Sequence, residues 1–185
     1  MPLNPVVLTE EEIIKGCKSN KPVAQKALFL RYGPIMMTVC RRFARHQMEA
    51  EDFVQEGFIK VFKNINSFKE ESSLGTWIRK IMINNALKHV SKSAFKKEQI
   101  GIEPNYDKDI APGTYAKLSA EEIMNLIEEL PNGYRIVFNL YAIEGYSHKE
   151  IADQLGIGES TSRSQLLKAR RMLQEKFIEL QKIAV

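Results

Sequence analysis

The sequence of 185 residues contains few of the side chains from which disulfide frameworks, metal sites and catalytic triads are built. Its two cysteines, Cys17 and Cys40, form no CxxC pair, which indicates reduced, packed thiols rather than a disulfide or a zinc site. The three histidines, His46, His89 and His148, lie far apart in the sequence. There is no HExxH motif and no glycine-rich phosphate loop. We therefore expect no catalytic residue, no metal, no cofactor and no enzymatic activity.

Long apolar runs and strictly alternating apolar and polar residues are absent as well. No run approaches the roughly 18 residues of a membrane span. The segment Met1–Leu8 is too short for a signal peptide and lacks the basic start of one. These absences predict a cytoplasmic chain without membrane insertion. Apolar residues instead recur at helical spacing through most of the chain, so the sequence predicts an all-α protein.

Charged residues are unevenly distributed along the chain, whose formal net charge is +4. Acidic residues are concentrated in segments 10–12, 49–56 and 121–129, and basic residues in segments 79–97 and 163–171. This separation predicts one polyanionic partner and a second partner of different chemistry.

The most informative pattern lies in segment 147–173. Ser147 followed by Glu150 has the spacing of a capping box and predicts the start of a short helix. Gly156 stands where the chain must turn, a position that favours left-handed φ. A second helix follows, and the small Ala152 lets the two helices cross closely. This Ala-x3-Gly spacing is typical of a helix-turn-helix.

The second helix of this motif, expected from about Glu159, has a polar outer face. Its hydroxyl, amide and cationic groups suit base edges and phosphates in a major groove. The residues of this face are Ser160, Thr161, Arg163, Ser164, Gln165, Lys168 and Arg171. The alternative is an ordinary helical hairpin with a solvated basic face. We favour a DNA-reading helix because the spacing and the side-chain chemistry agree.

A second informative helix is predicted over Glu49–Ile65. Apolar residues recur there at i, i+3 and i+4 and define one broad buried face. The opposite face carries Asp52, Gln55, Glu56, Ile59 and Lys63. At ~100° per residue, Ile59 points almost directly away from the buried stripe. An apolar side chain among acids and amides is typical of a protein-docking patch, although single exposed apolar residues are normal.

The next segment joins a polar loop, Asn66–Ser73, to a helix expected from Leu74 to about Ser91. The loop contains Phe68 and Lys69, and the helix contains the only tryptophan, Trp77. The basic and amide residues of the helix are Arg79, Lys80, Asn84, Asn85, Lys88 and His89. Basic side chains and amides in this arrangement can follow a nucleic-acid backbone, and aromatic rings can stack on its nucleobases. The alternative is that Trp77 belongs only to the apolar core.

Helix signals fill most of the remaining chain. Thr9 and the glutamates after it predict a helix start, and Pro22 is well placed to begin the next helix. The remaining helices are expected at 10–19, 22–44 with a break at Gly33-Pro34, 120–129 and 132–143.

The segment from Ser93 to Lys117 collects glycine, proline and aspartate and predicts a linker, with a short helix at Ala94–Gln99. The sequence therefore predicts two helical domains, residues 1–92 and 119–185, joined by a flexible linker, residues 93–118.

Three parts of the chain, in this order, resemble the extracytoplasmic-function (ECF) sigma factors, a two-domain group of bacterial sigma factors. AEDFVQEGFIKVFKNINSF (50–68) resembles their core-polymerase-binding helix and the loop after it. LGTWIRKIMINNALKH (74–89) resembles the helix that reads the −10 element and melts the promoter. Residues 130–173 resemble their domain 4, which reads the −35 element.

This resemblance implies a sigma domain 2 helical bundle, a sigma domain 4 with a helix-turn-helix, and a function in promoter-specific transcription initiation. It implies core RNA polymerase as a partner, through the β′ clamp helices and the β flap, together with promoter DNA. Whether an anti-sigma factor holds the chain inactive is left open.

The resemblance also assigns roles to particular residues. The residues that match the core-polymerase-binding face are Asp52, Gln55, Glu56 and Ile59. Asn84 and Trp77 match the asparagine and the tryptophan of the −10 helix. The candidate −10 contacts as a whole are Lys63, Phe68, Lys69, Trp77, Arg79, Lys80, Asn84 and Lys88. Thr161, Arg163, Ser164 and Lys168 match the −35 recognition helix. Some positions depart from the family pattern, which leaves the promoter sequence open: Ile83, Lys88, Ser162 and Gln165.

Two other functions compete with this one. A helix-turn-helix transcriptional regulator would use the C-terminal motif without binding core polymerase as a sigma subunit. It would not require an acidic docking helix followed by a basic, aromatic segment for single-stranded DNA. An enzyme acting on nucleic acid is disfavoured because no catalytic constellation is present.

Overall fold

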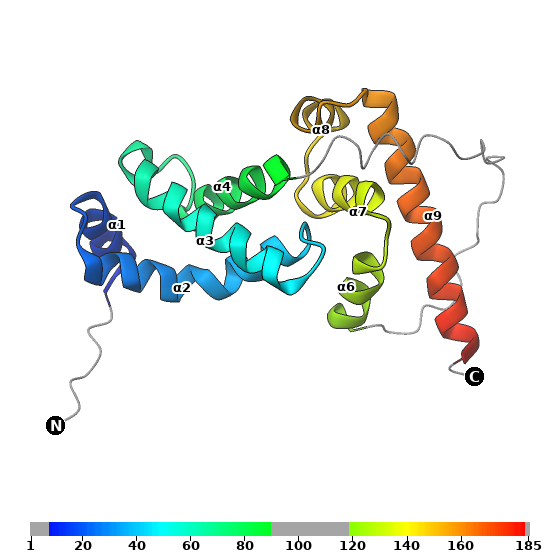
Figure 1. The fold of residues 1–185 in the computed structure, drawn as a ribbon, viewed down its shortest axis with the longest axis horizontal. Coiled ribbons are helices and arrows are strands. Elements are labelled where there is room, and N and C mark those ends of the chain that lie inside the picture. The colour runs from blue at the N-terminus through cyan, green and yellow to red at the C-terminus, as the bar shows by residue number, and fades with distance from the viewer. Residues whose placement is uncertain (1–7, 90–118, 184–185) are drawn as a thin grey trace. The chain divides into compact units, whose positions relative to one another are not determined.

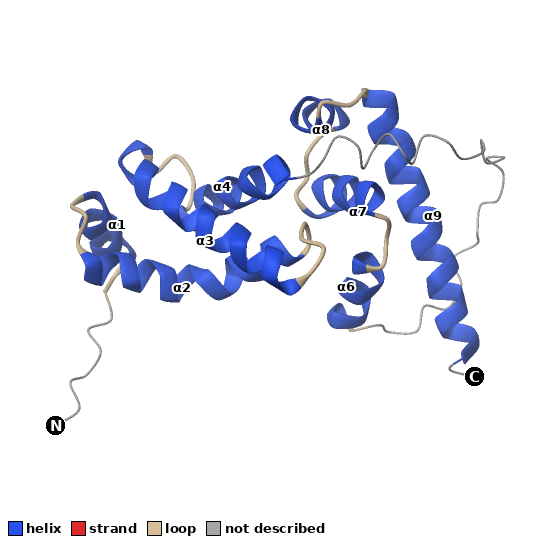
Figure 2. Ribbon diagram, viewed as in Figure 1, coloured by secondary structure: helices blue, strands red, loops and turns tan. Residues whose placement is uncertain are grey.

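The computed structural model describes residues 8–89 and 119–183. The chain divides into two compact units, Met1–His89 and Val90–Val185 (Figure 1). Every regular element within the described residues is a helix (Figure 2), so the all-α prediction is confirmed there. The expected linker, with its short helix at 94–99, lies outside the described residues, and the domain limits remain a prediction. None of the described helices is long and apolar enough to cross a membrane.

The first unit is a bundle of helices around an apolar core. Its elements are α1 (Glu10–Lys18), α2 (Pro22–Arg41), α3 (Gln47–Asn64), the short 3-10 helix η1 (Ile65–Ser67) and α4 (Leu74–His89). Helices α2, α3 and α4 pack on one another, and α1 packs on α2. The largest fully buried side chains include Leu28, Met36, Ile78 and Met82. The apolar face of α3 and the apolar face of α4 are thus both buried in this core.

Helix α2 is continuous through Gly33-Pro34, so the expected break at this point is wrong. Pro34 lies inside the helix, where it cannot donate a hydrogen bond to the carbonyl of Leu30. Leu30 is exposed, so water can solvate that carbonyl. The buried residues on either side, Leu28 and Tyr32 before the proline and Met36 after it, hold both halves against the bundle. Their burial offsets a proline cost of about 3 kcal/mol.

Helices α3 and α4 cross closely at Gly57. A Cβ atom on Gly57 would lie 2.1 Å from the sulfur of Met82. Glycine at this point lets the buried Met82 side chain pack directly on the backbone of α3, which draws the two functional helices together.

The second unit contains α6 (Ala120–Glu128), α7 (Asn132–Phe138), the π-helical segment η3 (Asn139–Ile143), α8 (His148–Leu155) and α9 (Glu159–Ile183). Helices α6, α7 and α8 all contact the long α9. The helix expected over 132–143 is present, but its last turns are π-helical, a detail that helical periodicity does not predict.

Capping fixes the helix starts that the sequence predicts. Thr9, Ser119 and Ser147 each form a complete capping box with the glutamate three residues later. Gly156 ends α8 in the left-handed region at φ 64° and ψ 39°. A residue with a Cβ atom is strained in that conformation, which explains the glycine at the turn between α8 and α9. The helix-turn-helix prediction is confirmed.

Candidate polymerase and nucleic-acid interfaces

The outward face of α3 brings together the four residues expected to bind core polymerase. Asp52 and Gln55 are exposed, and Glu56 is half-buried at one edge of this face. Ile59 lies between these polar residues and keeps 53% of its surface exposed. Lys63, expected among the −10 contacts, lies one turn after Ile59 on the same face. The structure therefore groups it with the docking residues.

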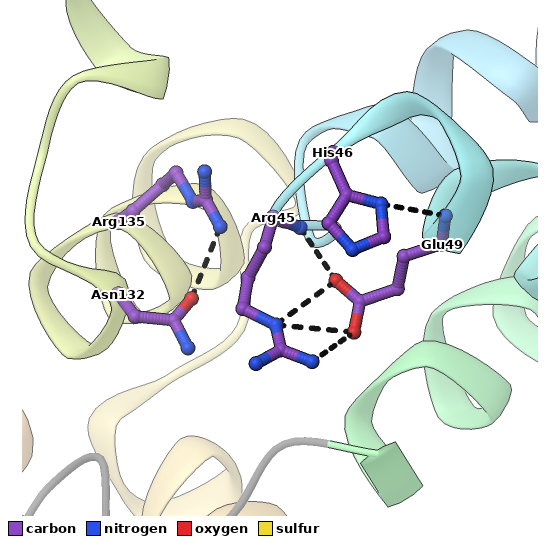
Figure 3. A network of polar contacts seen from close by, with 5 residues as sticks. All are labelled: Arg45, His46, Glu49, Asn132 and Arg135. Atoms are coloured by element: carbon purple, nitrogen blue, oxygen red, sulfur yellow. Dashed lines mark hydrogen bonds and ion pairs between the residues drawn. The ribbon is translucent and has the colours of Figure 1, made fainter.

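A polar network fixes the first turn of α3 (Figure 3). The ring of His46 accepts a hydrogen bond from the Glu49 backbone N–H at 3.2 Å and caps the helix. The Glu49 carboxylate accepts hydrogen bonds from the Arg45 backbone N–H at 2.6 Å and from its guanidinium at 2.9 Å. Burial raises the pKa of Glu49, but the hydrogen bonds from Arg45 outweigh it and hold the pKa below its usual value. Figure 3 also draws a bond inside the second unit, from Arg135 to Asn132 at 3.0 Å.

The last residue of α4 contacts the docking face. The Nε2 atom of His89 lies 3.0 Å from a carboxylate oxygen of Glu56. The imidazole also packs against the ring of Phe53, with the ring centroids 5.2 Å apart. Glu56 is therefore oriented by the end of the neighbouring helix, whereas Asp52 and Gln55 project freely from α3.

One side of α4 carries four of the eight candidate −10 contacts. Trp77, Lys80, Asn84 and Lys88 follow one another at intervals of three or four residues and share a face. Lys80, Asn84 and Lys88 are exposed, and Trp77 is half-buried. Arg79 lies on the opposite side of the helix, ~160° from Trp77 at 3.6 residues per turn, and is half-buried. The structure does not bring Arg79 together with the other four.

Phe68 is buried, so its expected place among the exposed −10 contacts is wrong. Only 5% of its surface is accessible, and its ring packs on that of Trp77 with the centroids 5.3 Å apart. The indole of Trp77 therefore packs on the core through Phe68 and remains partly accessible, and its contact with DNA stays a prediction. The neighbouring Lys69 is exposed, as expected.

Asn85 has a structural role that the sequence did not separate from its neighbours. Its side chain is 1% exposed and donates a hydrogen bond to the Phe53 carbonyl at 3.0 Å. Its amide oxygen accepts a hydrogen bond from the Lys60 ammonium. Because both partners are on α3, this amide fixes the register of α4 against the docking helix.

On α9, six of the seven residues expected to read the −35 element are at least partly accessible. Ser160, Arg163 and Arg171 are exposed, and Thr161, Ser164 and Lys168 are half-buried. Arg163 pairs with Glu159 one turn earlier, and Arg171 pairs with Glu175 at 2.9 Å. The Lys168 ammonium lies 5.9 Å from the centroid of the Tyr134 ring.

Gln165 is buried, so its assignment to the outer face of α9 is wrong. It is 2% exposed and lies on the side of the helix that also carries Leu166 and Ala169. The outer face instead includes Leu167, 39% exposed, and the exposed Arg170. These two residues are four and seven positions after Arg163, a spacing that could have identified them once the orientation of the helix was known.

His148 connects the two helices of the helix-turn-helix. Its Nδ1 atom lies 2.9 Å from the hydroxyl of Ser162, which is fully buried in α9. The imidazole stacks on the ring of Tyr141 with a centroid separation of 4.5 Å. Burial, and then the charge of Arg163, lower the pKa of His148, while Glu159 opposes them and Arg170 adds the smallest effect. This contact couples α8 to the recognition helix.

Two family models match the chain once each. Residues 28–95 match the model of Sigma-70 region 2, and residues 120–173 match that of Sigma-70, region 4. The ECF RNA polymerase sigma-E factor of Haemophilus influenzae is 28% identical over 181 residues, which cover 91% of this chain and 95% of that protein. The RNA polymerase sigma-H factor of Pseudomonas aeruginosa is 24% identical over 177 residues, 89% of this chain and 91% of that protein.

Among solved structures, the sigma factor RpoE of Bartonella quintana, bound to the anti-sigma factor NepR, is 23% identical. The match covers 83% of this chain and 96% of that chain, with a TM-score of 0.48.

Together the two matches cover more than half of the chain. Region 2 followed by region 4 defines a promoter-recognition protein. The chain belongs to the sigma-70 family, in its ECF group. Its function is promoter-specific transcription initiation as a sigma factor. A regulator that only reads duplex DNA is not favoured, because such a protein does not need a region 2.

Proposed function

We propose that the exposed face of α3 formed by Asp52, Gln55, Glu56 and Ile59 docks on the β′ clamp helices of core RNA polymerase. The exposed Ile59 supports this assignment, because it gives the face an apolar centre surrounded by polar groups. Asp52, Gln55 and Ile59 are exposed and do not belong to the apolar core of the bundle, and Glu56 is oriented by His89 at the edge of the face.

Two further surfaces contact promoter DNA. The α4 face of Trp77, Lys80, Asn84 and Lys88, with Lys69 in the loop before it, binds the opened −10 strand. The half-buried indole supports stacking, and the exposed lysines support contacts to the backbone. The N-terminal half of α9 reads the −35 element through Ser160, Arg163 and Leu167, while Lys168 and Arg171 contact phosphates.

The remaining assignments follow from this function. Domain 2 occupies residues 1–92 and domain 4 residues 119–185, the protein acts in the cytoplasm, and it has no enzymatic activity of its own. Domain 4 also contacts the β flap. An anti-sigma factor is a further candidate partner of this protein.

The observation that carries the docking proposal is the exposed Ile59 with acids and an amide around it, and a charge reversal tests it. Asp52→Lys is expected to weaken binding to purified core polymerase at least about tenfold, since like-charge contacts across an interface are costly. Its far-UV circular dichroism should not change, because exposed substitutions alter stability by only about 0.5 kcal/mol.

Glu11→Lys is the matched control. Glu11 is an exposed acid of the same unit, but it lies on α1 and not on α3. If Glu11→Lys weakens core binding as much as Asp52→Lys, the effect is one of net charge and the proposed face is incorrect.

A further inference from the structure

Lys18, near the end of α1, reaches the loop that precedes α4. Its ammonium lies 3.5 Å from the backbone carbonyl oxygen of Phe68 and 3.6 Å from a carboxylate oxygen of Glu70. Lys18 and the loop are fifty residues apart in the sequence. The contact therefore ties the N-terminal helix to the segment from Phe68 to Ser73.

This loop has a constrained backbone. Glu70 has φ 62°, in the left-handed region that residues with a Cβ atom rarely adopt. Such conformations persist only where the surrounding structure holds them. At one end, Phe68 is buried against Trp77. At the other, the Ser73 hydroxyl accepts a hydrogen bond from the Thr76 N–H at 3.2 Å and caps α4. The third contact that holds the loop is the ion pair between Lys18 and Glu70, the residue with the left-handed backbone.

We propose that Lys18 is a positioning residue for promoter opening: through Phe68 and Glu70 it holds the loop in the conformation that presents Lys69 and Trp77 to the −10 strand. The inference rests on the proposed −10 function of that surface. Lys18 acts through the loop and does not itself contact DNA.

A substitution of Glu70 can distinguish a positioning role of Lys18 from a purely electrostatic effect on DNA binding. Glu70 places a negative charge in a surface expected to bind a polyanion. If charge alone mattered, Glu70→Gln would strengthen DNA binding, since it removes repulsion from phosphates. If the Lys18–Glu70 contact positions the loop, the same substitution weakens binding and opening. The two explanations therefore predict opposite signs.

The experiment uses full-length chain with core polymerase and a promoter selected by that holoenzyme from a pool with randomised −10 and −35 elements. The promoter is prepared as a duplex and as a fork with the −10 strand already open. Opening of the duplex is followed by permanganate reactivity, and fork affinity by fluorescence anisotropy at several salt concentrations. The variants are Lys18→Met, Lys18→Arg, Glu70→Gln and Lys15→Met, the last an exposed lysine on the same helix.

We expect Lys18→Met and Glu70→Gln each to lower fork affinity and duplex opening about two- to fivefold, the range for one exposed ion pair. The double variant should lose no more than either alone, Lys18→Arg should retain activity, and Lys15→Met should behave as wild type. The salt dependence of fork affinity should be the same for Lys18→Met as for wild type, because a residue that does not contact phosphate releases no counterions. The proposal is overturned if Glu70→Gln strengthens binding, or if Lys18→Met reduces the salt dependence as a phosphate contact would.

Lys69→Met and Trp77→Phe test the proposed −10 surface separately. If neither changes fork affinity, the surface itself is misassigned. If they weaken binding while Lys18→Met and Glu70→Gln do not, the surface stands and the positioning role of Lys18 fails.

Discussion

The two units differ in how their contact surfaces relate to their cores. In residues 8–89, the candidate docking face of α3 lies opposite a core of large apolar side chains, and Asn85 has hydrogen-bond partners on α3. In residues 119–183, the recognition helix α9 itself buries Ser162 and Gln165 between its candidate reading residues. The candidate docking face is thus largely separate from the core in the first unit, whereas in the second unit the candidate recognition helix also contributes buried polar side chains.

The largest expected effect is a loss of stability of the first unit caused by a substitution in its apolar core. Ile78 in α4 has no accessible surface. Ile78→Ala should lower the free energy of unfolding by about 2–5 kcal/mol, because it removes buried methyl groups and leaves a cavity. Urea unfolding followed by the fluorescence of Trp77, the only tryptophan, reports on this unit.

Ile59→Ala is the matched control, an isoleucine of the same unit at an exposed position. It should leave unfolding within about 0.5 kcal/mol of wild type while weakening core binding. A stability loss for Ile59→Ala comparable with that of Ile78→Ala would mean that docking face and core are not separable.

The second prediction distinguishes base contacts from phosphate contacts on α9. Arg163→Ala should relax preference at one −35 base pair by about 1–3 kcal/mol, the value of an arginine that binds a guanine through two hydrogen bonds. Lys168→Ala should weaken binding to all sequences and reduce the salt dependence, as expected for a phosphate contact. Single-base −35 variants titrated at two salt concentrations measure both.

Equal loss for every −35 variant with Arg163→Ala would assign Arg163 to a phosphate. In that case Leu167 and Arg170, which lie on the same exposed face, become the next candidates for base contacts.

The sequence predicts local features of this fold well because they depend on neighbouring residues. The capping boxes at Thr9, Ser119 and Ser147 and the turn at Gly156 are all present. The continuity of α2 through Pro34 was not predictable locally, because it depends on burial against α3 and α4.

The errors at the candidate sites share a physical cause. Helical periodicity gives the angle between residues, but not which direction faces the rest of the protein. Gln165 is polar, which favours an outward position, although the buried arc of α9 includes it. Phe68 is an aromatic residue in a polar loop, which favours base stacking, although its ring packs on Trp77. Both depend on tertiary packing that no local pattern specifies.

The third prediction tests the polar core of the second unit. The Gln165 side-chain oxygen is buried and has no hydrogen-bond partner among the described residues. Gln165→Met keeps a similar shape and removes this desolvated oxygen, so it should raise the free energy of unfolding by about 1 kcal/mol. Thermal unfolding by circular dichroism measures it, with Gln174→Met at an exposed position of α9 as control. A loss of stability instead would show that the buried amide holds α9 in place.

The smallest expected effect is a pH dependence located at His148. Its pKa is lowered in the folded chain, first by burial and then by the charge of Arg163. The unfolded chain therefore binds a proton more readily, so the stability due to neutral His148 is complete above its unfolded pKa of about 6.5. That contribution is lost as the pH falls through 6.5 toward the lower folded pKa.

His148→Gln keeps a hydrogen-bonding group near Ser162 but cannot titrate. Between about pH 7.5 and about pH 5.5 the wild-type melting temperature should therefore fall further than that of the variant. Glu12, Glu49 and Glu122 do not interfere, because their pKa values lie below 4.5 and their contributions are lost only in more acidic solution. Equal shifts in both proteins would locate the pH dependence elsewhere. A larger wild-type shift, together with weaker −35 binding at the lower pH, would show that protonation at α8 is transmitted through Ser162 to the reading helix. That result would confirm the coupling of fold and function in the second unit.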